Sequence, residues 1–140
     1  MEPSSERRAR ISSILEAKAG NTENIAVTSM AIWDHISLPL ARMIGRVGVA
    51  SLFERCISVQ ASNHSWLPHG NKSVLDDSLY TGVWESLRRQ TPDVALATSI
   101  EIFTCFFELL STLIGERLTM RVFQTGISDD KNEPKKEISE

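Results

Sequence analysis

Apolar residues recur at every third or fourth position through most of the chain, which is the spacing of one face of a helix. The pattern is clearest after Gly48, where one helical face is formed by Val49, Leu52, Phe53, Cys56, Ile57 and Gln60. The alternate face of the same segment is polar. No segment alternates between apolar and polar residues with hairpin turns on either side, so no strand is predicted. The chain is therefore predicted to be all-α.

Glycine, proline and capping residues divide this pattern into separate helices. A first helix is predicted to end at Gly20, and a second begins with Asn21 or Thr22 as its capping residue. Pro39 is expected to kink or restart the second helix, because proline lacks the backbone donor and crowds the preceding turn.

The later breaks predict a bundle with a long last helix. Gly45 and Gly48 are the next interruptions, and the run Thr91-Pro92-Asp93 is a strong signal for the start of a helix. The last helix is predicted over residues 92–124, either unbroken or bent at Gly115. Together the segments predict a compact bundle of about five helices with a long C-terminal helix.

The chain also echoes part of its own sequence at an offset of 70 residues. Residues 25–53 and 95–123 share seven identical positions, including the Ile-Gly pairs that end at Gly45 and Gly115. Such an echo indicates either a pseudo-two-fold duplication around one core or two independent amphipathic helices filled with similar residues. Because glycine in a helix is tolerated where backbones approach closely or a helix bends, the two glycines are predicted to mark a crossing of the paired helices.

Length and charge restrict the class of protein. At 140 residues the prior is one domain, which is predicted to span residues 1–127. Residues 128–140 contain three lysines, five acidic residues and one proline, a composition typical of a disordered tail. The net charge of −3 argues against a nucleic-acid partner, because a nucleic-acid-binding domain is normally clearly basic.

The two cysteines and the most apolar segment of the chain indicate where in the cell the protein is expected. Cys56 and Cys105 both stand within apolar helical patterns, where buried, reduced thiols are expected. No signal-peptide pattern opens the sequence, so a cytoplasmic location is expected. Glu101 and Glu108 interrupt the apolar segment 94–114 and lie with other polar residues on one helical face. We therefore expect a core helix and no membrane partner.

His35 is the first candidate for chemistry, in the run Trp33-Asp-His-Ile-Ser-Leu-Pro-Leu40. This run resembles the phospho-acceptor box of histidine kinases, in which a helical histidine is followed by an acid and then by Pro-Leu. Ile36 stands in place of the acid, and Pro39 comes one residue early. The resemblance implies a phosphotransfer histidine exposed on a helical bundle. The alternative is a structural histidine bonded to a neighbour such as Asp34.

The other polar candidates carry weaker signals. His64 and His69 flank a Ser-Trp-Leu-Pro loop, but no further metal-ligand motif accompanies them, so a surface loop anchored by Trp66 is expected. Glu101 and Glu108 lie two turns apart, roughly 10 Å along a helix, and are interpreted as a polar face. The sequence contains no phosphate-binding loop, dinucleotide fingerprint or nucleophile elbow. We therefore predict no enzyme, no cofactor and no metal.

Two apolar surfaces are candidates for binding. A ligand pocket between helices, with a plain aromatic core as its alternative, is predicted from Trp33, Trp84, Phe103, Phe106 and Phe107. A homodimer interface on the second apolar edge of the last helix is predicted from Ile102, Phe106, Leu109, Leu113 and Met120. These features favour a cytoplasmic, non-enzymatic regulatory or protein-interaction module that acts as a helical homodimer. The alternatives are a sensor for a small apolar ligand and a histidine phosphotransfer protein.

Overall fold

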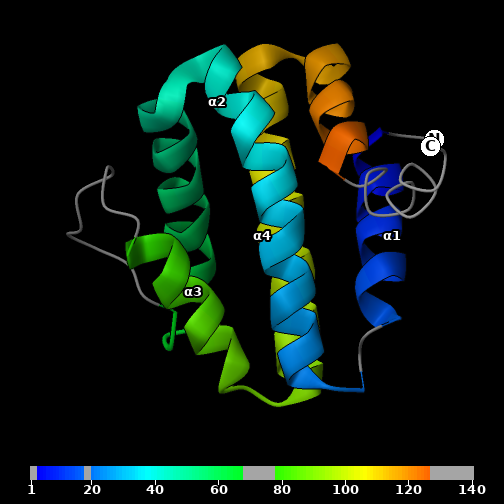
Figure 1. Cartoon of the computed structure of the whole chain (residues 1–140), viewed down its shortest axis with the longest axis vertical. Coiled ribbons are helices and arrows are strands. Elements are labelled where there is room, and N and C mark those ends of the chain that lie inside the picture. The colour runs from blue at the N-terminus through cyan, green and yellow to red at the C-terminus, as the bar shows by residue number, and fades with distance from the viewer. Residues whose placement is uncertain (1–2, 18–19, 68–77, 127–140) are drawn as a thin grey trace, which may run out of the picture.

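The chain folds into a helical bundle. The computed structural model describes residues 3–17, 20–67 and 78–126. Its helices are α1 (Pro3–Glu16), α2 (Thr22–Ala61), α3 (Ser78–Arg88), α4 (Pro92–Ile114) and a final helix over residues 116–126 (Figure 1). The described residues contain no strand, and the predicted all-α bundle is confirmed. The tail over residues 128–140 lies outside the described residues.

The two central helices begin at the capping residues that the sequence indicates. The side-chain oxygen of Asn21 accepts hydrogen bonds from the backbone N–H of Glu23 at 2.7 Å and of Asn24 at 3.3 Å. At the start of α4 the Thr91 hydroxyl accepts the N–H of Val94 at 3.3 Å, and proline occupies the first turn. Both caps satisfy donors that have no partner within the helix, which fixes where each helix starts.

The course of α2 differs from the prediction at its proline. The helix passes through Pro39 without ending, so the expected restart there is wrong. Proline costs a helix one backbone hydrogen bond but has a φ close to the helical value. The helix is interrupted instead at Gly45, where φ is 85° and ψ is 159°, while Gly48 lies inside the helix that follows. The predicted interruption at Gly45 is thus confirmed.

The unbroken form of the helix predicted over residues 92–124 is wrong, and the chain changes direction at Gly115, where the alternative placed a bend. α4 ends at Ile114, and Gly115 has a φ of 92° and a ψ of 160°, outside the helical region. Its N–H still donates to the carbonyl of Ser111 at 2.9 Å, and its own carbonyl accepts the N–H of Thr119 at 3.1 Å. One residue therefore ends α4 and begins the next helix, and a helical hairpin replaces the long C-terminal helix.

Residues 116–126 fold back against both central helices. The ring of Phe123 lies edge-on to the ring of Phe107, with the centroids 5.2 Å apart. At the end of this helix the backbone of Gly126 comes so close to α2 that a Cβ atom there would overlap the Cγ2 atom of Ile36. Glycine at position 126 therefore permits the close packing of this helix on α2.

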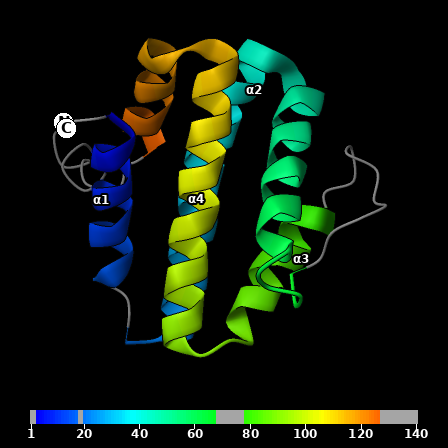
Figure 2. The ribbon, with the colours of Figure 1, turned by 180° about the vertical axis from the view of Figure 1, so that it is seen from behind.

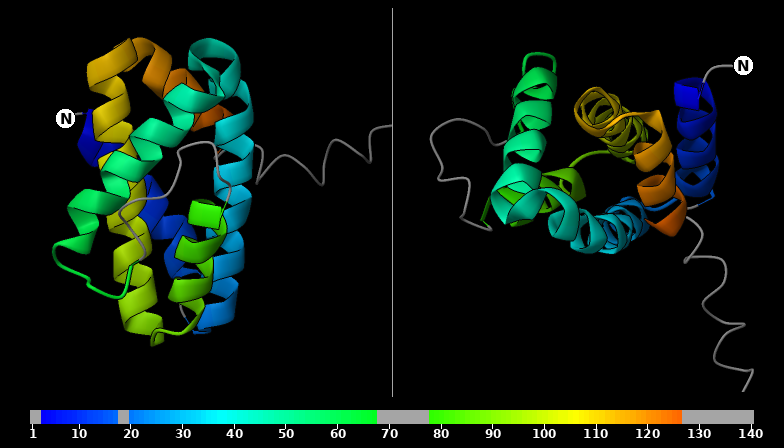
Figure 3. Two further views of the ribbon diagram at one scale, coloured as in Figure 1. Left: turned by 90° about the vertical axis from the view of Figure 1, so that its left-hand side faces the viewer. Right: turned by 90° about the horizontal axis from the view of Figure 1, so that it is seen from above.

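α2 and α4 form the centre of the bundle, and the shorter helices flank them (Figure 1). α1 packs chiefly against α4, and α3 packs chiefly against α2. In the view from behind, α4 takes the front position that α2 has in Figure 1, and α1 and α3 exchange sides (Figure 2). The hydroxyl of Ser29 donates to that of Ser99 at 3.3 Å between the two helices. The change of direction within α2 at Gly45 and the one after α4 at Gly115 lie at the same end of the bundle (Figure 3).

Aromatic side chains fill the space between the central helices. The Trp33 ring lies 4.7 Å from the Phe53 ring and 5.0 Å from the Phe106 ring, measured between centroids. The Trp84 ring from α3 stacks on Phe103 at 6.1 Å. All five of these residues are at most 4% exposed. Edge-on and offset ring pairs of this kind stabilise a core beyond their buried area, by about 0.5–1.5 kcal/mol each.

Candidate functional site

The end of the bundle where both central helices change direction exposes apolar and basic side chains together. We call this set the corner surface, and its members are Arg42, Met43, Arg46, Val47, Leu113, Arg117, Leu118 and Arg121. The four apolar members are between 36% and 59% exposed, and all four arginines are exposed. Gly45 and Gly115 create this surface, because each turns the chain so that residues before and after it face solvent. A cluster of exposed apolar residues with a polar rim is typical of a binding surface.

The corner surface has a local excess of positive charge. Among the described residues, no carboxylate lies within ion-pair distance of the four arginines of the corner surface. The arginines that do form ion pairs in the described part of the chain are Arg7, Arg8 and Arg88. The chain as a whole has a net charge of −3, whereas the charged residues of the corner surface are all positive. A concentrated charge of one sign attracts an oppositely charged partner and increases its association rate.

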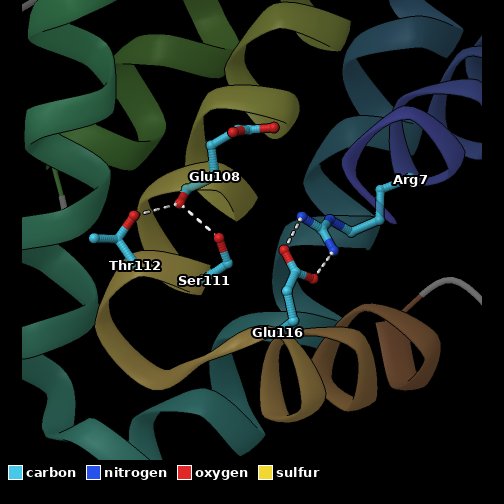
Figure 4. Close-up of polar contacts among 5 residues, drawn as sticks. All are labelled: Arg7, Glu108, Ser111, Thr112 and Glu116. Carbon is cyan, nitrogen blue, oxygen red and sulfur yellow. Dashed lines mark hydrogen bonds and ion pairs between the residues drawn. The ribbon is translucent and has the colours of Figure 1, made fainter. Parts of the chain in front are cut away.

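Glu116 is the acidic residue nearest to Gly115, and it is held by α1. Its two carboxylate oxygens accept hydrogen bonds from the guanidinium of Arg7, Oε1 from Nη1 at 2.7 Å and Oε2 from Nη2 at 3.2 Å (Figure 4). The Arg7 side chain is only 2% exposed, whereas that of Glu116 is 47% exposed. The bonds from Arg7 lower the pKa of Glu116 below its ordinary value. The carboxylate of Glu116 therefore neutralises Arg7 and forms no ion pair with the arginines of the corner surface.

Two hydroxyl side chains form hydrogen bonds with the backbone in the last turns of α4. The hydroxyls of Ser111 and Thr112 both donate to the backbone carbonyl of Glu108, at 2.9 Å and 3.1 Å (Figure 4). Bonds of this kind satisfy carbonyls near a helix end and favour bending. The small polar residues before Gly115 therefore help to end α4 and to position the corner surface.

His35 is exposed on α2, as the resemblance to a phospho-acceptor box requires. Its Nδ1–H donates to the backbone carbonyl of Ala31 at 2.8 Å, because a carbonyl can only accept. In the neutral ring Nε2 is then the atom with the free lone pair. His35 lines a shallow pocket of about 430 Å³ together with Asp34, Leu38, Pro39, Arg42 and Thr125. The imidazole is thus accessible and shares its pocket with a cation.

The aromatic residues predicted to form a ligand pocket divide into two groups. Phe103, Phe106 and Phe107 are at most 1% exposed and pack in the core. Trp33 and Trp84 line an open cavity of about 300 Å³ between α2 and α3, with Met30, Asp34, Ser37, Tyr80 and Thr81. This volume lies at the lower limit for small-molecule sites. Of these five residues, Trp33 and Trp84 lie at this cavity between described parts of α2 and α3, and the three phenylalanines do not line it.

The predicted homodimer edge of α4 is covered by the chain itself. Ile102 and Phe106 are 1% and 0% exposed, and Leu109 and Met120 are half-buried against the core. Only Leu113, at 59%, is clearly exposed. Ile102 and Phe106 are thus covered within the single chain, and the homodimer interface stays a prediction. The cover comes from α1, α2 and residues 116–126.

The remaining polar candidates are not brought together. Glu101 pairs with Arg8 of α1 at 3.0 Å, so the polar stripe of α4 contacts another helix. The His64 ring lies 5.6 Å from the Trp66 ring, while His69 lies outside the described residues. Within residues 3–17, 20–67 and 78–126 no group of three or more potential metal ligands is found.

Comparison with known proteins finds no matching family model, no curated relative and no solved structure. By length and composition alone, α2 and α4 are each apolar enough to cross a membrane, a property that core helices of soluble proteins share. The function therefore has to be inferred from the surfaces of this chain.

The corner surface was missed at the level of sequence, although a signal for it exists. Each repeated Ile-Gly pair is followed within two residues by an arginine, Arg46 after Gly45 and Arg117 after Gly115. Glycine was interpreted as the point where two helices cross. Nothing lies within 4 Å of a Cβ placed on either glycine, so that interpretation is wrong. If both glycines are interpreted as helix ends, the arginines beside them are predicted to be exposed to solvent.

Proposed function

We propose that the protein is a non-enzymatic interaction module that binds an acidic, partly apolar segment of a protein partner through the corner surface. The observation that carries this proposal is the placement of four exposed arginines, which form no ion pair with another described residue, among four exposed apolar side chains at one end of the bundle. Arginine forms bidentate bonds with carboxylates and is enriched at protein interfaces. The apolar side chains supply the buried area, and the arginines select an acidic partner.

The charge on the corner surface favours a heterologous partner over a second copy. A homodimer formed through this surface would bring the arginines of two copies together, and like charges that meet at an interface cost several kcal/mol. The homodimer expected from the sequence also loses two of its interface residues, since Ile102 and Phe106 lie in the core. We therefore propose a monomer that binds an acidic helix or loop.

We further propose that the bundle consists of two similar halves related by a pseudo-two-fold axis. Several features recur at the offset of 70: the caps Asn21 and Thr91, the hydrogen-bonded Ser29 and Ser99, and the glycines 45 and 115 with nearly equal φ and ψ. The reciprocal packing of α1 on α4 and of α3 on α2 fits the same relation. On this proposal each half contributes one corner, and the binding surface lies across both.

Charge reversal at the corner surface tests the proposed function. The probe is a synthetic helical peptide with leucine on one face and glutamate on the other, and its binding is measured by fluorescence anisotropy. We expect the double variant Arg46→Glu/Arg117→Glu to weaken binding by roughly 10-fold or more, because two attractions become repulsions. The matched control is Arg55→Glu/Arg89→Glu, which changes the same net charge at exposed arginines elsewhere and should bind like the wild type.

Three outcomes would contradict the proposal. Equal weakening in both double variants would show that net charge alone attracts the peptide. Preferential binding to vesicles that contain phosphatidylserine, with no binding to the peptide, would assign the surface to a membrane instead. A dimer in light scattering that Leu113→Asp dissociates would assign it to a second copy, since Leu113 is the most exposed apolar residue of the surface.

A second candidate function, phosphotransfer at His35, is favoured by the exposed ring and the neighbouring Arg42. Incubation with acetyl phosphate should then add one acid-labile phosphoryl group, detected by intact mass. His35→Ala should abolish the adduct, and His64→Ala should leave it unchanged. An unmodified wild-type protein, or an adduct that survives His35→Ala, would dismiss this candidate.

A further inference from the structure

The two cysteines of the chain lie on facing helices, one buried and one accessible. Cys56, in the part of α2 that follows Gly45, is 0% exposed, and its thiol donates to the backbone carbonyl of Ile102 at 3.1 Å. Ile102 lies one helical turn before Cys105 on α4, and Cys105 is only half-buried. The Cys56 thiol therefore lies over the segment of α4 that carries the other cysteine.

Contacts from successive turns of α2 converge on Cys105. The Cys56 thiol and the side chain of Gln60, one turn further along, both lie within reach of the Cys105 sulfur, so that each can donate to it when Cys105 is ionised. The bond from Cys56 lowers the pKa of Cys105 to about 7, against the opposing effects of burial and of the nearby carboxylates Glu108 and Glu101. The same bond and the burial of its sulfur raise the pKa of Cys56. Cys105 is thus the thiol of the pair that ionises more readily, and Cys56 keeps its proton.

We propose that Cys56 and Cys105 form a redox-active dithiol site, which hydrogen peroxide or an organic hydroperoxide converts to a disulfide that links α2 to α4. The accessible Cys105 is the attacking sulfur, and the buried Cys56 is the resolving sulfur. This arrangement is typical of redox-sensing cysteines, in which an exposed thiolate lies beside a resolving thiol. The site is separate from the corner surface and does not depend on the function proposed for it.

The reaction takes place in two steps. In the first, the Cys105 thiolate attacks the terminal oxygen of the hydroperoxide; the O–O bond breaks, and the leaving hydroxide or alkoxide takes a proton from water. This step oxidises the sulfur to a sulfenic acid. In the second, the sulfur of Cys56 attacks that of Cys105; the S–O bond breaks, and hydroxide leaves as water with the proton of the Cys56 thiol. One hydroperoxide is reduced for each disulfide formed.

Peroxide treatment of the whole chain tests this proposal. After oxidation and alkylation under denaturing conditions, we expect the protein to carry no alkyl group and to be about 2 Da lighter than the reduced, unalkylated protein; dithiothreitol before alkylation should restore the addition of two alkyl groups. Peptide mapping should give a cross-link between the peptides of Cys56 and Cys105. Because the disulfide closes a long loop that contains α3, the oxidised protein should also melt at a higher temperature.

Two variants separate the roles of the sulfurs. Cys56→Ser should stop at the sulfenic acid of Cys105, which dimedone labels, whereas Cys105→Ser should not react in the folded state. Native wild-type protein provides a reading that does not depend on how the variants fold: iodoacetamide should label Cys105 with a midpoint near its pKa of about 7 and leave Cys56 unlabelled. Equal labelling of both cysteines, or an oxidised product that is a sulfinic acid or a disulfide between chains, would overturn the proposal.

Discussion

Alanine in place of Gly45 or Gly115 is expected to lower the free energy of unfolding by about 1–3 kcal/mol at each site. Both glycines combine a φ near 90° with a ψ near 160°. This region is essentially restricted to glycine, because a Cβ atom would clash with the local backbone. The expected loss at each glycine is measured by urea or thermal unfolding. The two losses should add, since each glycine ends a different helix.

A larger substitution distinguishes backbone strain from side-chain overlap as the cause of this loss of stability. Nothing lies within 4 Å of a Cβ placed on either glycine, so Gly115→Leu should cost about as much as Gly115→Ala. If the glycines instead allowed two helices to cross, leucine would cost far more than alanine. The control is Gly20→Ala, where a Cβ also meets open space and φ lies outside the left-handed region. There we expect no loss, or a small gain from the reduced freedom of the unfolded chain.

Local signals in the sequence were sufficient for the helix starts and for the fold class. Asn21 and the Thr91-Pro92 pair are caps because their own side chains and rings satisfy or remove the first donors of a helix. These effects involve residues two or three positions apart, so no tertiary contact is needed to predict them. Helical periodicity in the same way excluded strands.

The end of α4 could not be predicted, because the apolar period continues across it. Ile114, Leu118 and Val122 keep helical spacing on both sides of Gly115, and a glycine within a helix costs only about 1 kcal/mol. A straight helix through Gly115 and a helical hairpin that turns there are therefore both compatible with the same spacing of apolar residues. The hairpin is stabilised by distant contacts, including the Phe123–Phe107 ring pair, and these involve positions that no local rule connects.

The candidate site was predicted less well for a related reason. The apolar surface of α4 is too wide for one neighbour, and its excess, including Phe106, was predicted to contact a second copy. In the structure α1, the second part of α2 and residues 116–126 of the same chain cover it. The apolar residues left exposed are those beside the glycines, such as Met43 and Leu113, because the chain turns away there. Which apolar residues remain exposed for binding depends on how the chain folds back after Gly45 and Gly115, and contacts between distant residues decide that course.

Removal of the Glu116 carboxylate is expected to destabilise the protein more than removal of any other paired carboxylate among the described residues. Glu116→Gln leaves the charge of Arg7 buried without a counter-ion, and the Arg7 Nε already has no hydrogen-bond partner among the described residues. Breaking a fully buried pair costs 3–5 kcal/mol. Because the Glu116 side chain is 47% exposed, water can partly replace it, and we expect a loss of about 1–3 kcal/mol in urea unfolding.

Glu101→Gln is the matched control for this prediction. It removes one bond of similar length from α1 to the C-terminal half, Arg8–Glu101 at 3.0 Å, but both side chains there are more than 40% exposed. Exposed pairs contribute about 0–1 kcal/mol, so the control should lose little. Arg7→Met should also lose less than Glu116→Gln, because it removes the buried charge and retains most of the side-chain volume. An Arg7→Met/Glu116→Gln double variant less stable than Glu116→Gln alone would contradict a role for the unpaired charge.

The pH dependence of the same variant provides an independent measurement. The pKa of Glu116 in the folded protein lies below its ordinary value of 4.5, chiefly because Arg7 donates hydrogen bonds to the carboxylate. A group whose pKa is lowered on folding stabilises the protein fully above its unfolded pKa and loses that contribution as the pH falls through its folded pKa. The difference in stability between the wild type and Glu116→Gln should therefore be constant near neutral pH and shrink as the pH falls below about 4.5. A difference that persists at the lowest pH at which the protein remains folded would mean that the loss comes from packing, and that the ion pair with Arg7 does not hold residues 116–126 against α1.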